Sequence, residues 1–271
     1  MTALAAIDTW PVVGVAAAVM APGAVVEARG PVEEVFSWAS LTKLLTALAT
    51  LVAVEEGTIA LDSPAGPPRS TVRHLLAHAS GLGPDDDRAL VPPGRRRIYS
   101  NRGFEALSEA VAEGAGMPFV DYVTAAVLQP LGMTATSWGG SAAKGARGPL
   151  IDLSHLALEL LRPTLVHEAT LAAATRPAFQ GLAGVLPGFG HHTPNDWGLG
   201  FELRDRKVPH WTGTANSPRT FGHFGRAGGF LWVDPDADLA CASLSDRDFD
   251  RWATTAWPAL SDAVLAEHAN R

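Results

Sequence analysis

The sequence predicts an α/β (α+β) fold in which an antiparallel sheet, built from both ends of the chain and flanked by helices, is interrupted by a helical subdomain. Strand-like runs lie toward the two ends, and helical periodicity fills the middle. The 271 residues, 47% of them hydrophobic, are enough to bury one large core or two small ones. We therefore expect one domain, with an α/β layer from residues 1–60 and 195–271 and a mainly helical subdomain from residues 61–194.

Five apolar runs are expected to be strands, and they span residues 12–20, 24–28, 197–203, 230–233 and 239–244. The clearest helix follows residue 41, because Leu44, Leu48 and Leu51 repeat at the helical period and Gly57 stands where a C-terminal cap belongs. Further helices are expected over residues 71–78, 104–113, 118–128, 154–174 and 251–268. The glycine- and proline-rich stretch 181–195 is expected to be a connection, with a lid as the alternative.

The charge balance argues against several kinds of partner. The chain has 21 Lys and Arg against 28 Asp and Glu, and a net charge of −7 repels nucleic acid and anionic lipid. No stretch reaches the roughly 18 apolar residues of a membrane span, and the apolar run near residues 12–21 lacks the basic flank of a signal peptide. The single cysteine, Cys241, fits a reducing compartment and is expected in the core. We expect a cytoplasmic protein without a nucleic-acid or membrane partner, and the oligomeric state stays open.

Ser40 and Lys43 lie one helical turn apart at the start of the first strong helix. A serine becomes a good nucleophile when a base takes its proton, and a lysine can be that base when burial or positive neighbours lower its pKa. The helix N-terminus also favours negative charge on the attacking oxygen. The alternative is an N-cap serine followed by a solvated lysine. Ser141 and Lys144 repeat the spacing in a glycine-flanked loop, so spacing alone does not decide.

Two further segments carry residues suited to the same chemistry. A Tyr99 phenol near Lys43 can pass a proton from the serine to a leaving group, and the Asn101 amide can hold a substrate carbonyl. Farther along, Gly225 sits beside a strand, where a glycine lets the backbone approach a ligand and the next N–H can face an oxyanion. The alternatives are a half-buried tyrosine next to a solvated arginine run, 95–97, and a plain hairpin or bulge around residue 225.

In this order and at these intervals, the three segments resemble the serine β-lactamase and penicillin-recognising family, particularly its class C and esterase branches. The stretches TVRHLLAHASGL at 71–82 and WGLGF at 197–201 also resemble that family, so the resemblance covers most of the chain. It implies a β-lactamase/transpeptidase-like fold. It also implies that Ser40 is the acylated nucleophile and that Lys43 and Tyr99 handle its proton.

The resemblance implies a substrate-binding set beside these three residues: Asn101, His223, Gly225 and Arg226. The backbone N–H groups of Ser40 and Arg226 would form the oxyanion hole. The family's third motif corresponds to residues 223–225, and Phe224 replaces the hydroxyl residue usual at its middle position. This replacement weakens the case for binding a β-lactam or peptide carboxylate, unless Arg226 or the 95–97 run binds that carboxylate instead.

We expect a serine hydrolase that hydrolyses an ester or amide of a small to medium substrate through an acyl-enzyme on Ser40. We expect esterase or amidase activity in preference to two alternatives. These are β-lactamase activity and activity as a D-Ala-D-Ala carboxypeptidase or aminopeptidase. No cofactor is expected. No metal is expected either, since His74 and His78 lack the intervening glutamate of a metal helix and His191 with His192 reads as an exposed loop pair. A non-catalytic ligand-binding homologue and a metal-assisted hydrolase are the rival readings.

Overall fold

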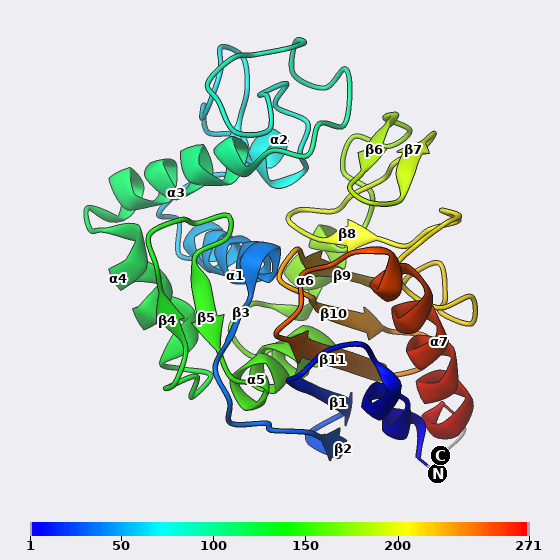
Figure 1. Ribbon diagram of the computed structural model, residues 1–271. Coiled ribbons are helices and arrows are strands. Elements are labelled where there is room, and N and C mark those ends of the chain that lie inside the picture. The colour runs from blue at the N-terminus through cyan, green and yellow to red at the C-terminus, as the bar shows by residue number, and fades with distance from the viewer. Residues whose placement is uncertain (1, 270–271) are drawn as a thin grey trace.

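The computed structural model, which describes residues 2–269, contains a six-stranded antiparallel sheet built from both ends of the chain (Figure 1). In spatial order its strands are β2 (Ala24–Arg29), β1 (Val15–Ala21), β11 (Leu239–Ser245), β10 (Gly229–Asp234), β9 (Phe221–Gly225) and β8 (Glu202–Leu203). The predicted α/β class and the sheet drawn from both ends of the chain are confirmed.

The edge strand β8 is shorter than the predicted strand over 197–203. Only residues 202 and 203 pair with β9. The backbone N–H of Leu199 instead donates to Ala174 O at 2.7 Å, and that of Gly200 donates to Leu76 O at 3.0 Å. Gly200 has a φ of +90°, which glycine adopts without strain, so the chain bends toward the helices before the strand begins.

Helices cover both faces of the sheet. The turn η1 (Ala3–Thr9) and helix α7 (Arg251–His268) pack on one face, and α5 (Leu150–Leu161) packs against β1, β10 and β11 on the other. Along β10, Leu231 and Val233 belong to the core on the α5 face, whereas Phe230 and Trp232 belong to the core on the α7 face. Cys241 is buried in the second core, as expected.

Helix α1 (Thr42–Glu55) is buried along nearly its whole length. Helix α3 (Asn101–Ala115), helix α4 (Phe119–Val123) and the π-helical η3 (Thr124–Leu128) pack against α1, and α2 (Val72–Leu76) packs against α3. A further short helix, α6 (Glu168–Ala174), follows α5. The single helix predicted over 154–174 is wrong, because α5 ends at Leu161 and α6 begins at Glu168. Pro163 follows α5, and the Glu159 carboxylate accepts from the backbone N–H groups of Thr164 and Leu165.

Two small sheets complete the structure. Strands β3 (Phe36–Ser37), β5 (Ala146–Gly148) and β4 (Ser137–Trp138) form one of them beside α1. Strands β6 (Gly184–Leu186) and β7 (Gly190–His192) form a hairpin within the stretch expected to be a plain connection. Among residues 2–269, no helix combines the length and the apolar character needed to span a bilayer.

Candidate active site

Ser40 lies in the 3₁₀ turn η2 (Ala39–Leu41), directly before α1. Its neighbour Ala39 has a φ of +43°, a conformation that residues other than glycine rarely adopt. Thr42 Oγ1 donates to Ala39 O at 2.6 Å and accepts from the backbone N–H of Ala146 on β5 at 3.0 Å. The turn that presents Ser40 is thus fixed from α1 and β5, and such strain is typical of functional sites.

Lys43, in the first turn of α1, is completely buried, and three oxygen atoms lie within hydrogen-bond distance of its Nζ. Nζ lies 2.7 Å from Asn101 Oδ1, 2.9 Å from Ala143 O and 3.3 Å from Ser40 Oγ. Burial lowers the pKa of the Lys43 ammonium to about 7, although Glu105 and Asp85 raise that pKa and Lys144 lowers it further. A large share of Lys43 is therefore a neutral amine at neutral pH.

The two carbonyl oxygens near Nζ determine how the neutral amine is oriented. A neutral amine keeps two N–H donors and one lone pair, and both carbonyl oxygens, on Asn101 and Ala143, can only accept. With its hydrogens on those two oxygens, Nζ turns its lone pair toward the Ser40 hydroxyl. The geometry suits removal of the serine proton by Lys43.

Tyr99 lies across the site from Lys43, whose Nζ is 4.7 Å from the centre of the phenol ring. Burial raises the pKa of the Tyr99 phenol, and a side-chain hydrogen bond with Ser40 lowers it by less, so the phenol keeps its proton. Its oxygen is 3.4 Å from His223 Nε2. Lys43 is therefore the better proton acceptor of the two candidate bases, and Tyr99 is a proton donor.

His223 is a neutral acceptor in this arrangement. Its Nδ1–H donates to Phe224 O at 2.6 Å, which leaves Nε2 unprotonated and facing the Tyr99 hydroxyl. Burial and the nearby Lys43 lower the pKa of the imidazole to about 3. The third motif therefore offers a substrate no positive charge from its first residue.

His78 packs against the ring of Tyr99 and holds the backbone next to it. Its ring centre is 4.7 Å from that of Tyr99 and 4.7 Å from that of Trp197, and its Nδ1 accepts from the backbone N–H of Ser100 at 3.1 Å. Burial lowers the pKa of His78 well below its usual value, so this imidazole is also neutral. His78 and His74 thus have packing roles; His74 stacks on Phe179.

Asn101 contacts both Lys43 and an acidic side chain. The Oδ1 atom accepts from Lys43, and Nδ2 donates to Asp85 Oδ1 at 2.8 Å. The role of this amide in holding a substrate carbonyl stays a prediction. Asp85 is exposed, and Asn101 connects it to Lys43.

Gly225 brings β9 against η2. A Cβ atom on Gly225 would lie 2.3 Å from Trp38 O, so only glycine allows this approach. Arg226 follows at the end of β9, and its side chain is 87% exposed, 4.0 Å from Asp248. The backbone at 225–226 therefore lies beside the turn that carries Ser40.

The arginine run at 95–97 is not one solvated patch. Arg97 is buried, with an ion pair to Asp196 at 3.8 Å, and its guanidinium donates to four backbone carbonyls, those of Ala77, Ala178, Phe179 and Asn195. Four of its five N–H donors are thus occupied inside the protein, whereas Arg95 and Arg96 are exposed.

Phe224 points away from His223, as alternation along β9 requires. Its ring is buried on the α7 face, with ring centres 5.7 Å from Phe189, 5.1 Å from Phe249 and 5.8 Å from Trp257. Phe189 lies between β6 and β7, so this hairpin packs beside the third motif. Replacing Phe224 by threonine would therefore open a cavity in the core.

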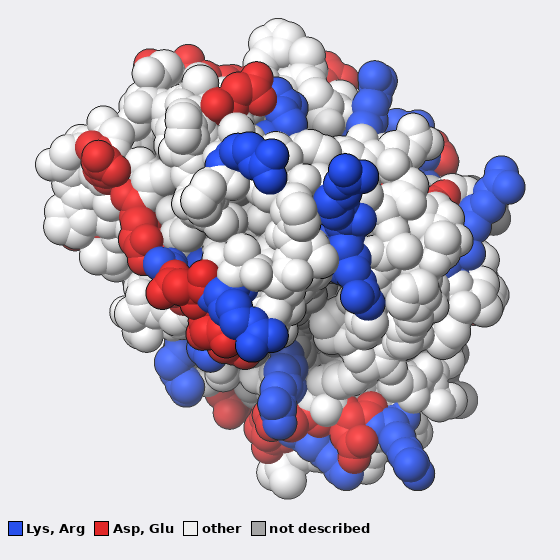
Figure 2. All heavy atoms as spheres, turned by 90° about the horizontal axis from the view of Figure 1, so that it is seen from above, with Lys and Arg blue, Asp and Glu red and all other residues white. Residues whose placement is uncertain are grey.

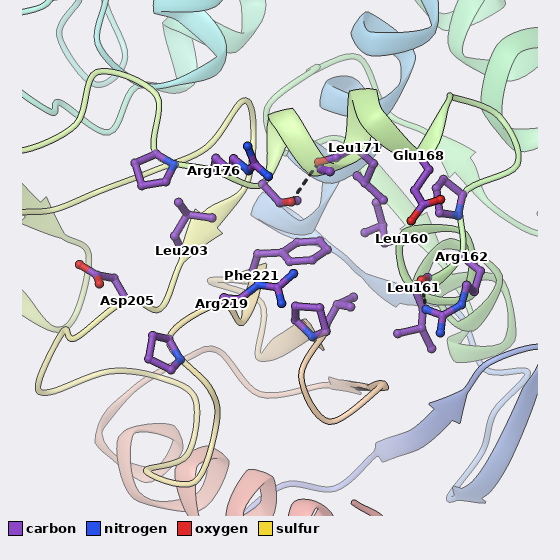
Figure 3. A pocket seen from close by; sticks show the side chains of 17 residues that line it. Leu160, Leu161, Arg162, Glu168, Leu171, Arg176, Leu203, Asp205, Arg219 and Phe221 are labelled. Atoms are coloured by element: carbon purple, nitrogen blue, oxygen red, sulfur yellow. Dashed lines mark hydrogen bonds between the residues drawn. The ribbon is translucent and has the colours of Figure 1, made fainter.

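A large cavity lies apart from these residues. It has a volume of about 1070 Å³ and opens at the edge of the sheet near β8 and α6 (Figure 3). Leucines and Phe221 line it, and Arg162 and Arg219 at its rim each pair with an aspartate at 2.7 Å. Neither Ser40 nor Lys43 contributes to its lining. The upper face of the molecule carries charges of both signs with uncharged surface between them (Figure 2).

A buried lysine amine beside a serine hydroxyl, with a phenol across the site, is an arrangement typical of serine hydrolases. The Beta-lactamase family model matches residues 8–265, and the chain belongs to that family. The family predicted from the motifs is therefore confirmed, and with it an enzyme of the serine-hydrolase class.

Known relatives agree with this assignment. A β-lactamase from Mycobacterium bovis is 55% identical and has a TM-score of 0.98 over 99% of this chain and 100% of that one. EstCE1, a hydrolase with promiscuous acyltransferase activity, shares the fold with a TM-score of 0.79 at 19% identity, over 97% of this chain and 96% of that one.

Two curated proteins match over shorter regions. Penicillin-binding protein 4* of Bacillus subtilis is 27% identical over 135 residues, 37% of this chain and 30% of that protein. The D-alanyl-D-alanine-carboxypeptidase/endopeptidase AmpH of Escherichia coli is 24% identical over 147 residues, 41% of this chain and 38% of that protein. The matched part of the chain thus spans about a third of each of these two relatives.

Proposed function

We propose that the protein hydrolyses a carboxylic ester or amide of a small to medium substrate through an acyl-enzyme on Ser40. The observation that carries this proposal is the set of acceptors around Lys43. Two carbonyl oxygens hold the hydrogens of the neutral amine, and its lone pair faces Ser40 Oγ at 3.3 Å. No cofactor enters the reaction.

The steps use the groups described above. The Nζ of Lys43 takes the Ser40 proton while Oγ bonds to the substrate carbonyl carbon. The backbone N–H groups of Ser40 and Arg226 stabilise the oxyanion. The bond to the leaving group then breaks, and that group departs with a proton delivered from Nζ through the Tyr99 phenol. The same amine then takes a proton from water, whose oxygen bonds to the acyl carbon; the bond between that carbon and Ser40 Oγ breaks, and the proton passes from Nζ back to Oγ.

Uncharged acyl substrates fit the third motif best. His223 is neutral, Phe224 supplies no hydroxyl and Arg97 is occupied, so the usual partners of a substrate carboxylate are missing from these positions. The second candidate activity is β-lactam hydrolysis, which the 55% identity to a Mycobacterium bovis β-lactamase favours. Rates with p-nitrophenyl butyrate and with nitrocefin separate the two candidates.

The test is covalent labelling with a fluorophosphonate probe, followed by intact mass and peptide mapping. We expect one adduct, on Ser40 and not on Ser141, that is lost in Ser40→Ala. Because protonated Lys43 has no lone pair, the labelling rate should rise with pH through about 7, the pKa of Lys43, and level off above it. A folded protein that gains no adduct between pH 6 and 9 would support a non-catalytic binder.

A further inference from the structure

The loop at residues 139–145 supplies one of the two carbonyls that orient Lys43. This loop carries the second serine-x-x-lysine pattern, Ser141 and Lys144, and, as predicted, it forms no helix. Ala143 is fully buried, and its carbonyl accepts from Lys43 Nζ at 2.9 Å. Because residues 141–143 belong to no helix or strand, regular backbone hydrogen bonds do not fix this carbonyl. Other contacts must hold residues 141–143 against α1.

Glu105, on α3, holds that loop. Its carboxylate accepts from the Ser141 hydroxyl and, at 3.2 Å, from the backbone N–H of Ala142. The Ser141 oxygen in turn accepts from the backbone N–H of Ala143 at 3.2 Å. From the other side, Thr46 Oγ1 on α1 donates to Ala142 O at 2.6 Å.

Two side chains on one face of helix α3 therefore position the hydrogen-bond acceptors of Lys43. Asn101 and Glu105 are four residues apart, which places their side chains on the same side of the helix. Asn101 reaches Nζ directly, whereas Glu105 reaches it through the loop. Together they fix both carbonyl oxygens that receive the hydrogens of the amine.

We propose that Glu105 is a positioning residue for the reaction: its carboxylate fixes the 139–145 loop so that the Ala143 carbonyl orients the Lys43 amine toward Ser40. This rests on the proposed function, because it assigns Lys43 the role of base. Glu105 touches neither Ser40 nor the oxyanion position, so it acts only through the loop and its charge.

The charge of Glu105 affects the pKa of Lys43, and a residue with a purely structural role would not change that pKa. Several groups face Lys43 from different elements: Glu105 on α3, Lys144 in the loop, Asp85 before α3, and the neutral His78, Tyr99 and His223. Among the charged neighbours, Glu105 raises the pKa of Lys43 most. Removing its charge should therefore lower that pKa and move the acid limb of the rate to lower pH.

The experiment compares wild type with Glu105→Gln, Ser141→Ala and the control Glu109→Gln, one turn farther along α3 and paired only with Arg102. Glu105→Gln should reduce the plateau labelling rate by about 10- to 100-fold and shift its acid limb downward. Ser141→Ala should reduce the plateau and leave the limb in place. Glu109→Gln should match wild type, and thermal unfolding shows that each variant is folded.

A second measurement does not depend on catalysis. The chain contains three lysines, Lys43, Lys144 and Lys207, so protein labelled with ¹³C-lysine gives three Cε resonances, and Lys43→Arg identifies one of them. The Lys43 resonance should titrate at lower pH in Glu105→Gln than in wild type or Glu109→Gln. An unreactive wild type would count against the proposed function alone. Unchanged titration and an unchanged labelling plateau in Glu105→Gln would overturn the role of Glu105.

Discussion

The protonation states of Lys43 and Tyr99 decide which of the two can be the base in the proposed reaction. Sequence reasoning could place both residues near Ser40 but could not assign the first proton transfer. Burial acts in opposite directions on the two groups: it lowers the pKa of the amine to about 7 and raises the pKa of the phenol. Near neutral pH the amine can accept a proton and the phenol can only donate one.

Tyr99→Phe tests this assignment. The substitution keeps the ring that packs on His78 and Trp197 and removes the hydroxyl, so thermal unfolding should change little. We expect kcat/KM on a p-nitrophenyl ester to fall by about 100-fold or more, because a proton donor to the leaving group is lost. The acid limb near pH 7 should persist, since it belongs to Lys43. Loss of that limb in Tyr99→Phe would make Tyr99 the base instead.

At the scale of elements, sequence periodicity located the long helices better than the strands. Helix α7 spans Arg251–His268 as predicted, because Trp257, Leu260 and Val264 recur at the helical period and face the second core. Strand β9 was not among the predicted strands. It is rich in glycine, and Gly222 is required because a Cβ there would lie 2.0 Å from Leu231 O. The need for glycine comes from the backbone of the neighbouring strand, so the sequence of β9 shows no alternating apolar pattern that would predict a strand.

The same limit applies to the site. The motif residues could be predicted from the sequence because their side chains suit the proposed chemistry. The Ala143 carbonyl could not be predicted, since every residue has a carbonyl and Ala143 is 100 residues from Lys43 in the sequence. Its only sequence signal was the glycine-flanked loop around Ser141, which indicated a turn without indicating its partner.

A buried ion cluster anchors the loop that follows β8, and it gives a prediction at this scale. Glu202 accepts from the ammonium of Lys207 and from Trp211 Nε1 at 3.0 Å, and it lies 2.8 Å from His210 Nε2. Burial alone would raise the pKa of Glu202, but Lys207 and His210 outweigh it and lower that pKa to about 2. Glu202→Gln should cost about 3–5 kcal/mol in the free energy of unfolding, because it leaves the Lys207 charge buried without a partner.

Urea unfolding across pH provides the check. A carboxyl with a depressed folded pKa stabilises the fold above its unfolded value of 4.5, and this contribution disappears as pH falls toward about 2. The difference between wild type and Glu202→Gln should therefore be largest above pH 5 and shrink in acid. Asp62→Asn, which breaks the exposed ion pair with Arg73, should cost under about 1 kcal/mol. A constant difference down to pH 2 would contradict the charged state assigned to Glu202.

At the scale of the whole molecule, the proposed reaction depends on how closely the sheet meets the turn before α1. Ser40 is carried by a turn before α1, and the proposed second oxyanion donor lies at the end of β9 in the main sheet. The two sides meet where Gly225 abuts the backbone of Trp38. The two proposed oxyanion donors keep their spacing only while this contact stays tight.

Gly225→Ala should therefore separate the two sides of the site. The added Cβ would lie 2.3 Å from Trp38 O, a backbone atom that can move only if η2 or β9 moves with it. We expect a loss of about 1–3 kcal/mol in the free energy of unfolding and a fall in kcat of about 10- to 100-fold. The matched control is Gly14→Ala, where the nearest atoms would be 3.6 Å from the new Cβ and activity should be retained. Wild-type kcat in folded Gly225→Ala would show that the N–H following Gly225 does not stabilise the oxyanion, and the site would then need a different second donor.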